Sequence, residues 1–251
     1  MGVFHFKKFD VCDDRSAMKV GTDGVLLGSA TEVSMNITSA LDIGTGCGLV
    51  ALMLAQRLAQ VSEAFRVTGI DIEEGAAADA EVNFRQSPWR SHLCSMNMSL
   101  KALEATSPEM SFDLIVSNPP YYDNSLEAPN VKRNVARHTG GGTLMNIPYS
   151  EGFLSYKEIL EYAKAHLAED GSLWLILPAD QEKELLRYAR MLRFEEYKML
   201  RIKSVVRKPP FRIIVAFRKG KTMPVEEELV LLDEKGRRTV EHASLTKDYY
   251  L

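Results

Sequence analysis

Apolar runs of strand length alternate with stretches of helical periodicity along most of the chain. The apolar runs predict strands at 40–43, 67–70, 92–96, 112–117 and 173–177. Helical periodicity predicts helices at 50–58, 74–84, 150–167 and 181–192 between or after them. This order is typical of a mostly parallel sheet with crossover helices on both faces, and it predicts an α/β fold.

The C-terminal third departs from this alternation. Two strand-like runs, 198–205 and 211–217, are joined by a short basic Pro-Pro loop and predict an antiparallel pair. The stretch 228–251 has strand character (LVLL), a turn at 233–236 and a tail with two tyrosines. We therefore expect a seven-stranded sheet with an antiparallel last strand. We expect a single domain over 1–251, with a core at 40–218 between an N-terminal extension (1–39) and a C-terminal extension (219–251).

Composition and charge indicate where the protein works and what it can bind, but they do not indicate a reaction. The formal net charge is -3, so nucleic acid would have to bind to a local basic patch rather than to the field of the whole protein. Cys12, Cys47 and Cys94 have neither disulfide-framework nor zinc-site spacing, and no apolar run reaches the length of a membrane span. The first ten residues lack the apolar core of a signal peptide. We expect a cytoplasmic protein without metal or membrane contacts, and a monomer is compatible with the sequence.

A glycine-rich turn separates the first predicted core strand from the helix after it. Asp42-Ile43-Gly44-Thr45-Gly46-Cys47-Gly48 places glycines at alternate positions, where a ligand could touch main-chain atoms at a helix N-terminus. The next strand ends at Asp71, which is placed to accept hydrogen bonds from ribose hydroxyls. A plain tight turn, with Asp71 capping the next helix, is the alternative. The pattern indicates an adenosine-type cofactor, and Asp42 could orient the loop.

Ser117-Asn118-Pro119-Pro120-Tyr121 follows the fourth strand. The side-chain oxygen of Asn118 and the carbonyl of Pro119 could accept both hydrogens of a planar amine and favour a pyramidal nitrogen. Methyl transfer from a sulfonium needs such alignment more than a base. The prolines fix the backbone, and Tyr121 offers a face for stacking. A turn that merely ends the strand is the alternative.

These motifs together carry a resemblance to a known family. DIGTGCG, GID and SNPPY resemble the N6-adenine and N5-glutamine branch of class I S-adenosylmethionine-dependent methyltransferases. Residues 6–30 (FKKFDVCDDRSAMKVGTDGVLLGSA), 135–142 (VARHTGGG) and 245–251 (LTKDYYL) are similar to the tRNA1(Val) adenine-37 N6-methyltransferase family. The resemblance covers nearly the whole chain. It implies a Rossmann-like fold, S-adenosylmethionine as cofactor and tRNA as substrate.

The resemblance assigns two sets of site residues. The expected catalytic residues are Asn118, Pro119, Pro120 and Tyr121. The expected cofactor-binding residues are Asp42, Gly44, Gly46, Gly48, Asp71, Asn97 and Asn118. The stretch 95–99 (SMNMS) lacks the acid that such a family places against the cofactor adenine, and only Asn97 and Ser99 are candidates there.

Basic residues in three places are candidates for RNA contact. The first two groups, in the N-terminal extension and in the polar segment 121–149, are Lys7, Lys8, Arg15, Lys19, Lys132, Arg133, Arg137 and His138. A third cluster surrounds the Pro209-Pro210 turn and contains Arg201, Lys203, Arg207, Lys208 and Arg212. Solvated surface charge without function is the alternative for each. The 121–149 segment has no periodicity, and a loop of that length is usually functional or disordered.

Two other functions remain open from the sequence. A protein glutamine N5-methyltransferase would use the same Asn-Pro-Pro-Tyr pocket, although the basic segments favour RNA. A nicotinamide-dependent oxidoreductase or a non-catalytic nucleotide-binding module would suit the glycine loop, but neither would use the Asn-Pro-Pro-Tyr motif.

Overall fold

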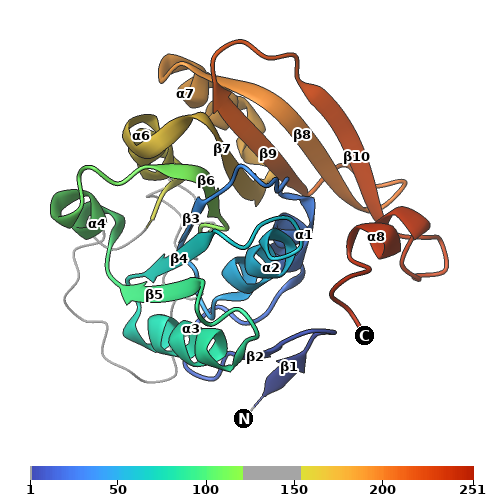
Figure 1. Cartoon of the computed structure of the whole chain (residues 1–251). Coiled ribbons are helices and arrows are strands. Elements are labelled where there is room, and N and C mark those ends of the chain that lie inside the picture. The colour runs from blue at the N-terminus through green and yellow to red at the C-terminus, as the bar shows by residue number, and fades with distance from the viewer. Residues whose placement is uncertain (1, 121–153) are drawn as a thin grey trace, which may run out of the picture.

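The computed structural model describes residues 2–120 and 154–251, and one eight-stranded sheet forms its centre (Figure 1). The strand order is β10-β8-β9-β7-β6-β3-β4-β5. In chain order the strands are β3 (Ser39–Ile43), β4 (Arg66–Asp71), β5 (Leu93–Asn97), β6 (Phe112–Ser117), β7 (Leu167–Pro178), β8 (Phe194–Val205), β9 (Arg212–Lys219) and β10 (Val225–Leu232).

The pairing confirms the predicted fold class and corrects the strand count. Strands β3 to β7 are parallel, and β9 runs antiparallel to both of its neighbours, β7 and β8. Strand β10 pairs parallel with β8 and adds an eighth strand at the edge. The sequence showed only part of β10 because its first four residues are exposed and only Leu229 and Leu231 are buried.

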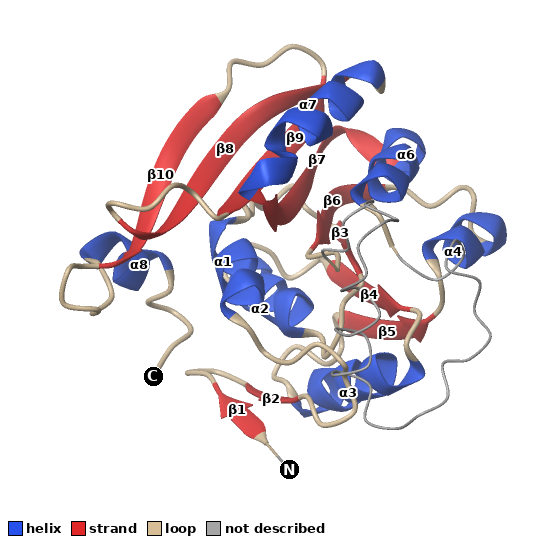
Figure 2. Cartoon of the chain, turned by 180° about the vertical axis from the view of Figure 1, so that it is seen from behind, coloured by secondary structure: helices blue, strands red, loops and turns tan. Residues whose placement is uncertain are grey.

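Helices cover both faces of the sheet (Figure 2). One buried cluster includes residues of α1 (Thr22–Ala30), α2 (Leu49–Leu58) and α3 (Glu74–Gln86). The other includes residues of α4 (Leu100–Thr106), α6 (Tyr156–His166) and α7 (Glu182–Met191). Neighbouring residues of β7 divide between them: Trp174 joins the first cluster and Leu175 the second. This alternation explains why the central strands are apolar without a polar face.

The helix predicted from residue 150 starts later, and its cap is Ser155. Ser155 Oγ accepts a hydrogen bond from the Glu158 backbone N–H at 3.3 Å, and the Glu158 carboxylate accepts one from the Ser155 N–H at 3.0 Å. This capping box fixes the start of α6 at Tyr156. Ser150 lies outside the described residues.

The two ends of the chain pack together. A short hairpin of β1 (Val3–His5) and β2 (Asp10–Cys12) lies beside the tail that follows α8 (Val240–Leu245). The Lys7 backbone N–H donates to the Tyr249 carbonyl at 2.9 Å, and the rings of Phe6 and Tyr250 stack 6.2 Å apart. Tyr249 is buried, and its hydroxyl donates to the Met53 carbonyl of α2 at 3.3 Å. The tail therefore anchors the hairpin to the core.

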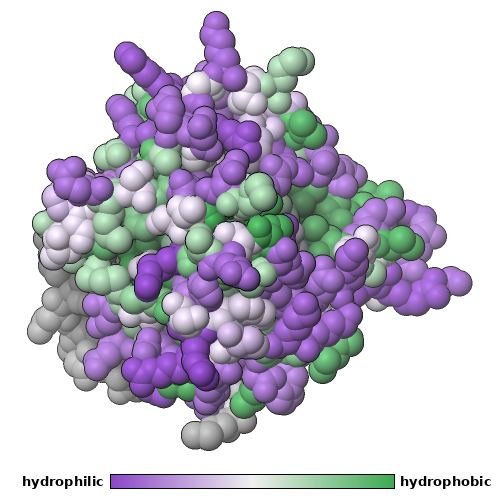
Figure 3. Space-filling model, in the orientation of Figure 1, coloured by the Kyte–Doolittle hydropathy of each residue, from purple (hydrophilic) through white to green (hydrophobic). Residues whose placement is uncertain are grey.

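The surface of the described residues is mainly polar. On the face shown in Figure 3, hydrophilic side chains dominate and apolar ones are interspersed among them. None of the described helices combines the length and the apolar character needed to cross a membrane.

Candidate active site

The glycine loop lies between β3 and α2 and is built from left-handed backbone. Gly44, Gly46 and Gly48 have φ values of 69°, 57° and 85°. The N–H groups of Gly44 and Thr45 both donate to the Ile70 carbonyl of β4 at 2.9 Å. A Cβ on Gly48 would lie 2.5 Å from Phe84 Cε1, so a larger residue does not fit there. A Cβ on Gly46 would meet nothing within 4 Å, so open space lies beside the middle of the loop.

Asp42 supports this loop from within the protein. Its side chain is buried, and Oδ2 accepts hydrogen bonds from Thr45 Oγ at 2.7 Å and from the Ala51 N–H at 3.2 Å. Burial raises the pKa of Asp42 to about 7, and nearby Asp71 adds to the shift. These contacts fit the predicted orienting role of Asp42.

Asp71 ends β4 and accepts backbone hydrogen bonds on both carboxylate oxygens. Oδ2 accepts from the Gly46 N–H at 2.8 Å, and Oδ1 accepts from the Glu73 N–H at 2.9 Å. Burial raises the pKa of Asp71 despite these bonds. Since Asp71 holds the glycine loop directly, the two predicted cofactor elements meet at one place. The N-cap of α3 is Glu73, so Asp71 does not occupy the cap position that the alternative required.

Asn97 and Ser99, at and after the end of β5, make local contacts. Asn97 Nδ2 donates to the carbonyls of Asp71 and Ile72 at 3.0 and 3.1 Å. Ser99 Oγ caps α4 by accepting from the Ala102 N–H at 3.1 Å. Asn97 thus lies at the predicted cofactor edge and fixes the backbone around Asp71.

Asn118, Pro119 and Pro120 follow β6 at the same edge. Because β3 and β6 are parallel neighbours, the glycine loop after β3 and the residues after β6 begin side by side (Figure 1). Ser117 Oγ donates to the Ile43 carbonyl at 2.7 Å and ties the two ends together. Asn118 is half-buried, its Nδ2 lies 3.9 Å from Met18 Sδ, and Pro119 is buried. Tyr121 lies outside the described residues.

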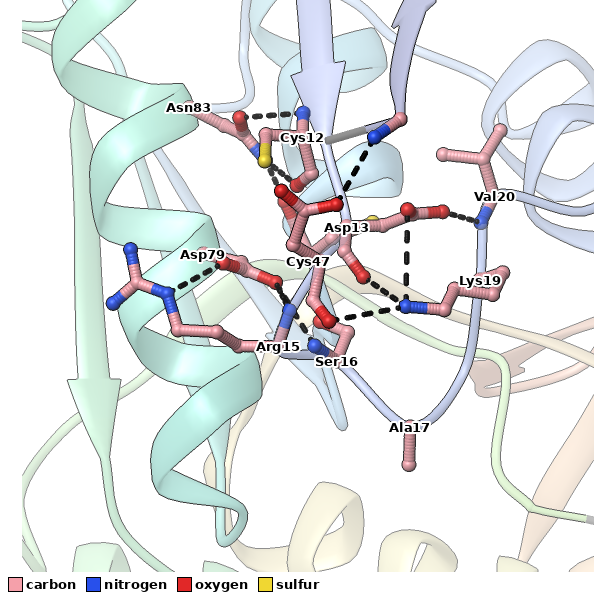
Figure 4. Close-up of polar contacts among 12 residues, drawn as sticks. Cys12, Asp13, Arg15, Ser16, Ala17, Lys19, Val20, Cys47, Asp79 and Asn83 are labelled. Atoms are coloured by element: carbon pink, nitrogen blue, oxygen red, sulfur yellow. Dashed lines mark hydrogen bonds and ion pairs between the residues drawn. The ribbon is translucent and has the colours of Figure 1, made fainter. Parts of the chain in front are cut away.

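The basic residues of the N-terminal extension have different surroundings. Lys7 Nζ donates to the Lys247 carbonyl at 2.6 Å, which ties it to the C-terminal tail, whereas Lys8 is exposed. Arg15 Nε lies 3.1 Å from Asp79 Oδ1 on α3, and Lys19 Nζ donates to the Asp14 carbonyl at 3.3 Å (Figure 4). The side chains of Arg15 and Lys19 both remain 57% exposed. Lys132, Arg133, Arg137 and His138 lie outside the described residues.

Four of the five residues of the third basic cluster form ion pairs with acidic side chains. Arg201 pairs with Glu182 and Glu226, each at 2.6 Å. The other pairs are Lys203 with Glu228, Arg207 with Glu234 and Arg212 with Asp23. The sequence could not show these pairs because the acidic partners come from α1, α7, β10 and the turn after β10.

Asp79 and Asn83 of α3 were missed as residues of this region. Both are 1% exposed and point from α3 toward the N-terminal extension (Figure 4). The available signal was their position, since they share the buried side of α3 with Ala76 and Ala80. Polar residues on an apolar helix stripe need partners. In the part of the chain that the structure describes, no three metal-ligating side chains come together.

A glycine loop after β3, an acid at the end of β4 and Asn-Pro-Pro after β6 on one edge of such a sheet are the features of class I S-adenosylmethionine-dependent methyltransferases. A family model described as "Methyltransferase small domain" matches residues 20–141. The chain belongs to the tRNA1(Val) (adenine(37)-N6)-methyltransferase family.

Relatives that bear this name align over nearly their whole length. The protein from Actinobacillus succinogenes is 38% identical over 248 residues, which cover 99% of this chain and 97% of that one. The one from Parabacteroides distasonis is 37% identical over 251 residues, covering 99% and 97%.

Solved structures with low sequence identity share the fold. A predicted O-methyltransferase from Agrobacterium tumefaciens has a TM-score of 0.65 at 16% identity, covering 89% of this chain and 95% of that one. A 16S rRNA N2 G1207 methyltransferase from T. thermophilus, solved with AdoMet and guanosine, has a TM-score of 0.53 at 18% identity and covers 87% and 50%.

Proposed function

We propose that this protein transfers a methyl group from S-adenosylmethionine to the N6 amine of adenine 37 in tRNA1(Val). The observation that carries the proposal is the position of Asn118 and Pro119 beside the glycine loop, at the ends of neighbouring strands. The names of the full-length relatives support the same substrate.

The cofactor would lie against the glycine loop and the end of β4. Gly46 borders open space and would leave the backbone accessible, whereas Gly48 lets the loop pack against Phe84. Asp71 would accept the ribose hydroxyls with lone pairs not used by Gly46 and Glu73. Asp42 would orient the loop through its hydrogen bond with Thr45, and Asn97 would hold the Asp71 backbone. Asn118 would border both the cofactor and the target base.

When bound, S-adenosylmethionine supplies an electrophilic methyl group on a sulfonium. The side-chain oxygen of Asn118 and the carbonyl of Pro119 would accept the two N6 hydrogens and turn the nitrogen lone pair toward that methyl group. Pro119 and Pro120 would keep this geometry rigid, and Tyr121 would stack on a flipped-out base. The proton leaves after the new bond forms, so no general base is needed beside the amine.

The tRNA would reach this edge across the N-terminal extension and the 121–149 segment. Lys8, Arg15 and Lys19 have exposed side chains, and with Lys132, Arg133, Arg137 and His138 they would contact phosphates near the base. Lys7 and Lys19 would contribute less, because their ammonium groups are bonded to backbone carbonyls. In this proposal residues 1–39 close the site, 40–218 form the catalytic core, and the protein acts in the cytoplasm.

The decisive experiment is methyl transfer from labelled S-adenosylmethionine into total tRNA of a strain that lacks this enzyme, followed by nucleoside mass spectrometry. The expected product is N6-methyladenosine in one valine tRNA. Label in N5-methylglutamine of a protein, with none in tRNA, would overturn the proposal in favour of a glutamine methyltransferase. Asn118→Ala, with its cofactor affinity measured in parallel, is the matched negative control.

A further inference from the structure

Two buried side chains of α3 hold part of the N-terminal extension, residues 12–20, which we term the cover segment (Figure 4). Asp79 Oδ2 accepts hydrogen bonds from the backbone N–H groups of Arg15 and Ser16 at 2.7 and 2.9 Å. Its other oxygen lies 3.1 Å from Arg15 Nε. The carboxylate is 1% exposed, and the two backbone hydrogen bonds satisfy Oδ2, whereas Oδ1 has the ion pair but no hydrogen bond from a described residue.

Asn83, one turn further along α3, joins the cover segment to the glycine loop. Its Oδ1 accepts from the Cys12 N–H at 2.9 Å, and its Nδ2 donates to the Cys12 carbonyl at 2.7 Å. The same Nδ2 donates to the Cys47 carbonyl at 2.8 Å. One buried amide therefore fixes the cover segment relative to the loop that would hold the cofactor.

The cover segment and α3 are in very close contact. A Cβ on Gly75 would lie 2.7 Å from the Arg15 carbonyl oxygen, so only glycine permits this approach. Nearby, the Ala17 N–H donates to Glu73 Oε2 at 3.3 Å. The segment thus lies over the N-terminal turn of α3, whose Glu73 N–H donates to the Asp71 carboxylate.

Hydrogen bonds within the cover segment also join its two ends. Asp13 Oδ2 accepts from the Val20 N–H at 2.8 Å, which joins the two ends of the loop. Lys19 reinforces this closure by bonding to the Asp13 and Asp14 carbonyls. Met18 then extends to within 3.9 Å of the Asn118 amide and is 47% exposed. The cover segment therefore extends from Asn83, which bonds to the glycine loop, to Asn118, which follows β6.

We infer that Asp79 and Asn83 are positioning residues that hold the cover segment across the S-adenosylmethionine pocket. This inference rests on the proposed function, because it assumes that the cofactor lies between the glycine loop and Asn118. Neither residue touches the cofactor. Each acts through the backbone of residues 12–16, and Asn83 acts also through the Cys47 carbonyl.

The first test measures S-adenosylmethionine binding to Asp79→Ala by calorimetry. Loss of an acceptor for two N–H groups should weaken binding about tenfold. Asp79→Asn, which keeps one oxygen acceptor, should restore most of the affinity. Arg15→Ala should change the affinity by about twofold or less, because a half-exposed ion pair contributes little.

Asp113→Ala is the matched control. Asp113 Oδ2 likewise accepts two backbone N–H groups, from Thr38 and Ser39 at 2.8 and 3.0 Å, at the opposite edge of the sheet. This variant should lose thermal stability as Asp79→Ala does, yet bind S-adenosylmethionine within about twofold of the wild type. Equal affinity losses in both variants would show a general stability effect and overturn the inference.

Gly75→Ala tests the same contact from α3. The new Cβ must displace the Arg15 backbone that Asp79 holds, so S-adenosylmethionine affinity should fall several-fold. Because this displacement also lowers the stability of the apoprotein, the affinity is compared with that of Asp113→Ala at a similar loss of melting temperature. If the affinity of both Gly75→Ala and Asp79→Ala stays at the wild-type value, the inference is wrong. Since cofactor binding is measured without tRNA, a failed adenine assignment would not produce that result.

Discussion

Carboxylates in the two halves of the sheet bind different kinds of partner. In the parallel half, around β3 to β6, Asp42, Asp71 and Asp79 are largely buried and accept hydrogen bonds from backbone N–H groups of a helix start or a loop. In the half formed by β8, β9 and β10, Glu226 and Glu228 are half-exposed and pair with cationic side chains of the neighbouring strand. The first arrangement fixes the path of the backbone, whereas the second links side chains of neighbouring strands whose carboxylates are half-exposed.

The difference matters for function because a buried carboxylate that accepts from backbone N–H groups has no nearby group to replace it. Removing it leaves N–H groups without a partner in a buried place and frees the loop to move. Removing one member of an exposed ion pair lets water take its place. We therefore expect substitutions in the parallel half to alter the site, and substitutions in the β8–β10 half to alter little beyond local stability.

Asn118→Ala should give the largest effect. Loss of the side-chain oxygen should lower kcat for tRNA methylation by roughly a hundredfold to a thousandfold, as for other preorganised transition-state contacts. Cofactor affinity should stay near the wild-type value, because Asp71 and the glycine loop remain. Single-turnover methylation and calorimetry measure the two quantities. Near-normal activity would remove Asn118 from the reaction.

Asp71→Ala should weaken S-adenosylmethionine binding about a hundredfold. The substitution removes the proposed ribose acceptor and the hydrogen bonds to Gly46 and Glu73, each involving a charged group. Equilibrium binding of S-adenosylmethionine tests this. An unchanged dissociation constant would mean that the ribose is held elsewhere.

Asp42→Asn should change the pH dependence of stability. Burial raises the pKa of Asp42 to about 7, whereas an unfolded aspartate titrates near 4. Between these values the folded state binds more protons, so the Asp42 contribution to stability falls as pH rises from about 4 to about 7 and is level above. Urea unfolding at several pH values should show a flatter profile for Asp42→Asn. Parallel profiles for variant and wild type would contradict the shift.

Arg201→Met should have the smallest effect. Arg201 contacts Glu182 and Glu226, but its side chain is 29% exposed and Glu226 is 58% exposed. The free energy of unfolding should change by about 1 kcal/mol or less, with S-adenosylmethionine affinity unchanged. Lys203→Met, which removes the neighbouring pair with Glu228, is the control. A loss of cofactor binding in either variant would contradict the expectation that substitutions in the β8–β10 half leave the site unchanged.

Sequence patterns predicted the elements whose periodicity is strong. The central strands and helices α2, α3 and α7 lie within a few residues of their predicted positions. Helix α1 was not predicted, because TDGVLLGSA contains two glycines and is buried on nearly all sides, so no apolar stripe appears. The Ser155–Glu158 spacing was a readable signal for the start of α6.

The site was predictable where one short motif carries the chemistry. DIGTGCG and the acid after the next strand meet as expected, since both leave parallel strands at the same edge. The contact between Asp79 and Arg15 was not predictable, because they are 64 positions apart and the whole first βαβ unit lies between them. The pairing of Arg201 with Glu182 and Glu226 likewise depends on which strands become neighbours.

The packing of the two chain ends has a consequence for synthesis of the protein. Residues 4–9 leave the ribosome more than two hundred residues before their partners Tyr249 and Tyr250. Contacts of such sequence separation form late, because the intervening chain must be ordered first. During translation the N-terminal hairpin therefore lacks the tail, and Phe4 and Phe6 lack their ring contacts with Tyr250. Nascent protein should gain the contact between hairpin and tail only after its C-terminal segment has been synthesised.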